Sequence, residues 1–95
     1  MRYKIKQIKD IKDCDYAFEW WDWAKEKFSL NDYEVVYEGE IRGANPNAAL
    51  EELFEIFNVR HPEDFRGHSL SVSDVVELDG ANYYCDSAGW VRLEA

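Results

Sequence analysis

Residues 61–78 read HPEDFRGHSLSVSDVVEL, and this stretch decides the fold because it changes from a loop into a strand. Pro62 stiffens the entry to the loop, Gly67 relaxes its backbone, and Phe65 is expected to anchor it by burying its ring. The pattern from Ser73 to Leu78 predicts a strand. We therefore expect the remaining elements to be arranged around this loop and strand.

Two turn signals follow. Asp79-Gly80 predicts a two-residue type I′ turn, after which the chain pairs back on the strand. Residues 87–89 fit a three-residue hairpin loop that sets Cys85 opposite Val91 and Asp86 opposite Trp90. The resulting three-stranded meander is expected to share one apolar face, formed by Val76, Leu78, Tyr83, Cys85, Val91 and Leu93. The opposite face is expected to carry Val75, Tyr84, Trp90 and Arg92.

Four more elements are expected before the loop. Alternation of apolar and polar residues predicts strands at 2–8 and 33–41. A helix is predicted over 16–28 with Asp15 as its N-cap, and a second helix begins at Asn45-Pro46. The order β-α-β-α-β-β-β predicts a single small α+β domain with a C-terminal antiparallel three-stranded meander.

Each predicted helix presents one apolar stripe to the core. The first stripe consists of Ala17, Trp20, Trp21, Ala24 and Phe28. The second consists of Leu50, Leu53, Phe54 and Phe57, near which the helix should end with Asn58 in a left-handed conformation. Trp23 lies off the first stripe, so it either covers the edge of the core or contacts a partner.

The predicted strand over 33–41 has one apolar face, formed by Tyr33, Val35, Tyr37 and Ile41. If this strand lies beside the first, lysines and glutamates oppose each other, namely Lys4 and Lys6 against Glu34 and Glu38. Exposed pairs of this kind stabilise by about 0.2–1 kcal/mol each, but they help to select the pairing. Whether the first strand is central or at an edge stays open.

Composition excludes several classes of function. The chain has 95 residues, 20 acids and 11 bases, and a net charge of -9, so no direct nucleic-acid binding is expected. Cys14 and Cys85 lack metal spacing and are expected to be free thiols. The chain shows no export signal and no apolar run of about 18 residues, so we expect a cytoplasmic protein without a membrane partner.

No pattern of residues predicts a reaction. Histidines, serines and an aspartate occur together in the loop, but sequence proximity does not place a base within reach of a nucleophile, and no Gly-x-Ser-x-Gly is present. His61 and His68, with Asp64 between them, are a weak zinc signal. We therefore expect no catalysis, no metal and no cofactor.

Four segments carry a family resemblance. They read HPEDFRGHSLSVSDVV at 61–76, YEVVYEG at 33–39, LEELFEIFN at 50–58 and YYCDSAG at 83–89. They resemble the signature, the middle strand, the second helix and the closing hairpin of the YodL-like domain, which occurs in proteins of bacterial conjugative and other mobile elements, mostly in Firmicutes. The resemblance implies an association with mobile-element proteins and carries no established catalytic activity.

Three functional hypotheses follow. The first is a small non-catalytic protein-interaction or accessory module of a mobile element, which binds its protein partner through Asp64, Arg66, His68, Trp23 and Trp90. The second is an acidic DNA mimic that inhibits a host DNA-binding protein through Glu51, Glu52 and Glu55. The third is a metal or hydrolytic site around His68 and Asp64. The oligomeric state is open in all three.

Overall fold

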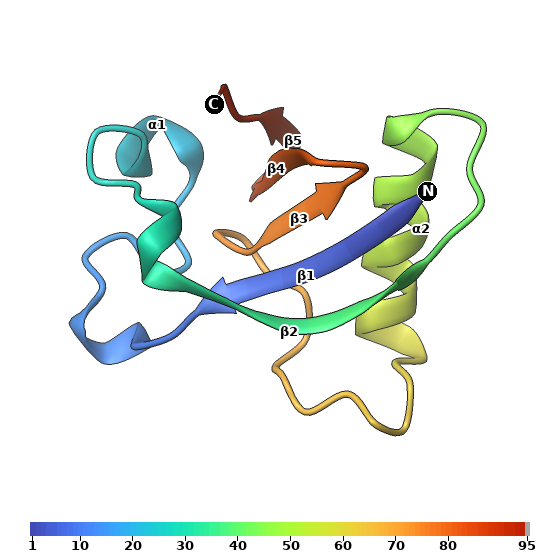
Figure 1. Cartoon of the computed structure of the whole chain (residues 1–95). Helices are drawn as coiled ribbons and strands as arrows, with labels where there is room; N and C mark the ends of the chain where they lie inside the picture. The colour runs from blue at the N-terminus through green and yellow to red at the C-terminus, as the bar shows by residue number, and fades with distance from the viewer. Residues whose placement is uncertain (95) are drawn as a thin grey trace.

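The computed structural model, which describes residues 1–94, contains a five-stranded antiparallel sheet with the order β2-β1-β3-β4-β5 (Figure 1). This confirms the α+β fold and its C-terminal meander, and it places β1 inside the sheet. The strands are β1 Arg2–Ile8, β2 Tyr33–Glu40, β3 Val75–Leu78, β4 Ala81–Asp86 and β5 Gly89–Arg92. The helices are α1 Trp21–Ala24 and α2 Pro46–Val59, with 3-10 turns η1 Ile11–Asp13 and η2 Leu30–Asp32.

Helix α2 packs on one face of the sheet (Figure 1). It begins as predicted, with the Asn45 side chain accepting a hydrogen bond from the Ala48 amide at 2.9 Å and Pro46 in the first turn. The core on this side consists of Tyr3, Ile5, Ala49, Leu50, Leu53, Phe57, Phe65, Leu70, Val76, Leu78 and Tyr83. The predicted stripe is correct except for Phe54, which is exposed at the outer edge of the helix.

The C-terminal end of α2 differs from the prediction. The helix continues to Val59, and Asn58 remains helical instead of adopting a left-handed conformation. The Asn58 side chain donates to the carbonyl oxygens of Phe54 and Leu70, at 2.8 and 3.0 Å. The amide thus joins the end of the helix to the loop that follows.

The opposite face of the sheet is covered by the irregular segment between β1 and β2. Its core consists of Ile8, Tyr16, Ala24, Tyr33, Val75 and Tyr84, with Trp21 and Phe28 packed against it. The predicted helix over 16–28 is wrong, since only α1, a single turn, forms within it. Asp15 is not an N-cap, and Trp20, which precedes α1, is exposed.

Tertiary hydrogen bonds explain why this helix does not form. The Phe18 amide donates to Ser73 Oγ at 2.8 Å, and the Tyr84 hydroxyl donates to the Glu19 carbonyl oxygen at 2.6 Å. Phe18 itself has a φ of 63°, which no helix accommodates. The sheet therefore binds this backbone directly, and packing overrides the helical pattern.

A bulge at Val36 changes the predicted face of β2. Ile5 pairs with Tyr37 and Lys6 pairs with Val35, so Val36 is the extra residue. Tyr37 therefore faces α2 whereas Tyr33 packs on the other face. The predicted single face of Tyr33, Val35, Tyr37 and Ile41 is wrong for this reason. Val35 is exposed.

The charge pairs between β1 and β2 are correct only in part. Lys4 pairs with Glu38 as expected, but Glu34 lies opposite Gln7 rather than Lys6. The Lys6 ammonium lies 2.8 Å from a carboxylate oxygen of Glu77 on β3, the next strand. A lysine in a central strand thus pairs across the sheet with an acid on β3.

The meander confirms the first predicted turn and corrects the second. Asp79 and Gly80 both have positive φ, and Leu78 pairs with Ala81. In the second hairpin, Cys85 pairs with Trp90, so the turn has two residues and the predicted register is wrong by one. As a result Trp90 faces α2. Val91 and Leu93 pack instead on the opposite face of the sheet.

Candidate functional site

The loop from 60 to 74, which joins α2 to β3 and is called here the central loop, is held by a buried aromatic anchor. Phe65 is buried as predicted, with its ring centroid 4.9 Å from that of Phe57 and 6.0 Å from that of Tyr37. The backbone after Ser73 joins the sheet, because the Ser73 amide donates to the Cys85 carbonyl oxygen at 2.9 Å. The loop is therefore fixed in its middle and at its C-terminal end.

A polar cluster of Gln7, His68, Ser71 and Asp74 lies where the central loop meets β1. Asp74 is buried, and its Oδ2 accepts from the Ser71 amide at 2.8 Å and from Gln7 Nε2 at 3.1 Å. Gln7 Nε2 also donates to the His68 carbonyl oxygen at 2.8 Å. His68 Nε2 lies 3.7 Å from Asp74 Oδ1. The cluster joins β1 to the loop through side chains.

Burial sets the protonation of this cluster. It raises the pKa of Asp74 to about 7, against the lowering effects of the Ser71 amide, the nearby His68 and Gln7. His68 Nδ1 lies 2.8 Å from the Ser69 carbonyl oxygen and 3.3 Å from Gln7 Nε2, so whether it donates or accepts depends on the tautomer of the ring. The remaining nitrogen, Nε2, faces the carboxyl group of Asp74. The Asp74 carboxyl group can therefore hold or release a proton near neutral pH.

The serines of the loop do not complete a catalytic arrangement. Ser71 Oγ donates to the Ser69 carbonyl oxygen at 2.7 Å, and Ser73 Oγ accepts from the Phe18 amide. Within residues 1–94, no serine hydroxyl hydrogen-bonds to the His68 ring. A base and a carboxyl group are brought together here, but the nucleophile that a triad needs is not.

Three of the predicted site residues lie on the central loop, and each makes different contacts. Asp64 accepts from the Tyr37 hydroxyl at 2.9 Å. The Arg66 guanidinium donates to the carbonyl oxygen of Glu63 at 2.6 Å, within its own loop. Arg66 and His68 line a shallow groove of about 450 Å³ beside β1 and β2. Asp64 is not part of that groove.

The two predicted tryptophans lie apart from the loop and from each other. Trp90 Nε1 donates to Glu51 Oε2 at 3.1 Å, and the ring meets Phe54 edge-on, so it joins β5 to α2. Trp23 belongs to α1, over the other face of the sheet, and is half exposed. The five predicted residues therefore do not form one site.

Two further rings of this segment are exposed, although the sequence placed Trp20 on the core-facing stripe of the predicted helix. Phe18 is 51% exposed and Trp20 is 59% exposed, close to the 52% of Trp23. Phe18 also lies 5.8 Å from the His68 ring, centroid to centroid, which connects the segment to the central loop. We call Phe18, Trp20 and Trp23 the aromatic surface. The run Trp20-Trp21-Asp22-Trp23 was the available signal, since one short helix cannot bury three tryptophans at these spacings.

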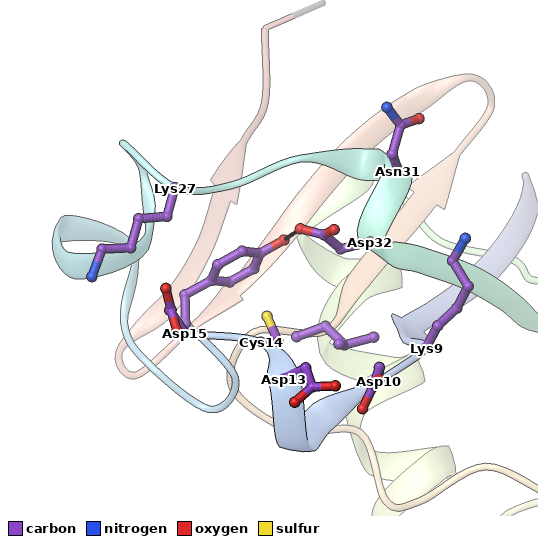
Figure 2. A pocket seen from close by; sticks show the side chains of 10 residues that line it. Lys9, Asp10, Asp13, Cys14, Asp15, Lys27, Asn31 and Asp32 are labelled. Atoms are coloured by element: carbon purple, nitrogen blue, oxygen red, sulfur yellow. Dashed lines mark hydrogen bonds between the residues drawn. The ribbon is translucent and has the colours of Figure 1, made fainter.

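An acidic hollow of about 490 Å³ is formed by the end of β1 and the segment that joins β1 to β2 (Figure 2). It is lined by Ile8, Lys9, Asp10, Asp13, Cys14, Asp15, Tyr16, Lys27, Asn31 and Asp32. The Tyr16 hydroxyl donates to Asp32 at 2.7 Å across it (Figure 2), and a hydrogen bond to Asp10 raises the pKa of Asp13. The described part of the chain has no group of three or more side chains placed to hold a metal ion.

None of the helices over residues 1–94 has both the length and the apolar composition needed to cross a bilayer.

Comparison with known proteins gives one result. A family model described as YodL-like domain matches residues 2–95. No curated protein and no solved structure matches the chain.

Proposed function

The chain belongs to the YodL-like domain family, and we propose that it is a non-catalytic module that binds a protein partner through the aromatic surface. The observation that supports this proposal is the exposure of Phe18, Trp20 and Trp23 on one short segment. Aromatic side chains are enriched at protein interfaces relative to the rest of the protein surface. We further propose that the partner belongs to a mobile genetic element, for which the family resemblance is the only support.

The aromatic surface is held by contacts that keep its rings out of the core. The Phe18 amide is bound by Ser73, and Glu19 is bound by the buried Tyr84. Trp21, between the exposed rings, packs on Tyr84 with centroids 4.9 Å apart. The backbone is thus fixed by the sheet, and a preorganised surface of this kind loses less entropy when a partner binds.

Arg66 and His68 of the central loop are also part of the proposed binding surface. His68 contacts Phe18, so the groove of Arg66 and His68 lies next to the aromatic surface. Asp64 and Trp90 have structural partners, Tyr37 and Glu51, and we do not include them.

A DNA mimic is the second proposal, supported by the exposed acids of α2. Arg60 lies 3.1 Å from Glu52 and 3.6 Å from Glu55, which reduces the charge of this helix face. Glu51 is bound by Trp90. A mimic needs a continuous acidic stripe, so these contacts favour the protein-binding proposal.

Affinity capture with defined variants tests the two proposals. We expect Trp20→Ala and Trp23→Ala to lose a specific partner from lysate of cells that carry the gene. Val59→Ala serves as the control, because Val59 is an exposed apolar residue on α2, away from this surface. A partner retained by both tryptophan variants, or lost with Val59→Ala, would argue against the proposal. Loss of nuclease inhibition on Glu51→Lys or Glu55→Lys would support the mimic instead.

A further inference from the structure

We propose that the partner inserts a lysine or arginine side chain onto the face of Trp23, in the place that Lys27 occupies in the free protein. This inference rests on the proposed function and adds the chemistry of the partner. It depends on one contact, on the exposure of the residues that make it, and on the charge of the segment around it.

The contact is a cation–π interaction. The Lys27 ammonium lies 4.1 Å from the centroid of the Trp23 ring. Both side chains are exposed, so this contact is worth only about 0.5–1 kcal/mol. A cation from outside can therefore replace Lys27 at little cost, and the ring face already has the geometry that an ammonium group requires.

The charge of the segment selects a basic partner. Residues 10–32 contain seven acids and three bases. Of the two bases that flank Trp23, Lys25 pairs with Asp22 at 3.6 Å and Lys27 covers the ring. Neighbouring acids such as Glu19 and Glu26 are exposed. Their field attracts a cationic segment and repels an anionic one.

The same charge disfavours two other occupants. A second copy of the chain would bring one acidic segment against another, which is repulsive unless the charges interdigitate. An anionic lipid surface would be repelled by a protein with a net charge of -9. A protein segment with exposed arginine or lysine is the occupant that fits both the rings and the charge.

Titration with synthetic peptides tests the inference. The probes are a short Gly-Ser peptide that carries arginines and the same peptide with glutamines, and the readouts are calorimetry and the NMR signal of the Trp23 indole. We expect the arginine peptide to bind and to shift this signal, and Trp23→Ala to weaken binding by about two- to five-fold, the worth of one exposed cation–π contact.

Lys27→Ala gives the sharpest result, because it should tighten binding of the arginine peptide by freeing the ring. Lys12→Ala removes the same charge from the same segment without touching Trp23, so it measures the general electrostatic effect. An equal gain in both variants, or equal binding of the glutamine peptide, would overturn the inference.

The inference and the proposed function fail in different ways. Suppose that binding of a natural partner depends on Trp20 and Trp23 but is unchanged after the partner's basic residues are neutralised. That result would leave the proposed function intact and would overturn this inference. A partner that ignores both tryptophans removes both.

Discussion

Gln7 Nε2 donates a hydrogen bond to Oδ2 of the buried Asp74 at 3.1 Å, across 67 positions of sequence. The same amide group donates to the carbonyl oxygen of His68 at 2.8 Å. One side chain of β1 thus fixes both the histidine of the central loop and the carboxyl group that precedes β3. Within residues 1–94, no buried side-chain nitrogen or oxygen is left without a hydrogen-bond partner.

Asp74 should make stability depend on pH in the direction opposite to that of an acid whose pKa is lowered by folding. Its pKa is about 7 in the folded chain, against 3.8 for an unperturbed group, so the folded state binds more protons between these values. The contribution of Asp74 to the free energy of unfolding is therefore complete below about pH 4. It falls by about 1.4 kcal/mol per pH unit for one proton and is lost as the pH rises through about 7. We expect Asp74→Asn, which stays neutral, to gain stability relative to the wild type over that range in urea unfolding.

His68→Gln provides the matched control for this measurement. His68 lowers the pKa of Asp74, so its removal should move the pH dependence to higher pH without abolishing it. A difference between wild type and Asp74→Asn that does not change from pH 4 to pH 8 would contradict the assignment.

Gly67→Ala should destabilise the central loop by about 1–3 kcal/mol through overpacking. A Cβ at this position would collide with Gln7 Oε1 and would lie 2.9 Å from the Phe65 ring. Neither neighbour can move, because Gln7 is bound to Asp74 and Phe65 is buried. Ser69→Ala, at an exposed position of the same loop, should have a small effect. Equal unfolding midpoints for the two variants would show that the loop relaxes freely.

Local chemistry made part of the fold predictable from sequence. Asp79-Gly80 adopts its turn because both residues tolerate positive φ. Asn45-Pro46 starts a helix because the asparagine side chain caps an amide three residues away. Each of these signals acts within a few residues, so no knowledge of the rest of the fold is needed.

Distant contacts decided what the sequence could not predict. The segment around Phe18 is bound by Ser73 and Tyr84, which lie more than fifty positions away. The register of the last hairpin follows the packing of Trp90 on α2, which the turn residues do not specify. His68 could be identified from its residue type. Its partner Gln7 could not, because the sequence shows there only a polar residue on the face of β1 toward α2.

Tyr84→Phe should loosen the aromatic surface. The Tyr84 hydroxyl is the group that binds the Glu19 carbonyl oxygen, so its removal should cost about 0.5–1.5 kcal/mol. We expect amide hydrogen exchange to increase over residues 16–24 and to change little in α2. Tyr83→Phe is the control, since no hydrogen bond of the Tyr83 hydroxyl is found in the described part of the chain. Similar exchange profiles for both variants would count against this tether.

The two cysteines should differ in reactivity, with Cys14 reacting first. Cys85 is buried, and burial raises its pKa to about 12, helped by the charges of Asp74 and Asp86. The thiolate is the reactive form, so Cys85 should remain inert in the folded protein. Cys14 is partly exposed at the acidic hollow (Figure 2). A thiol-specific reagent should therefore modify one cysteine under native conditions and two in denaturant. Cys14→Ala should leave no fast-reacting thiol, and a fast reaction in that variant would mean that β4 opens readily.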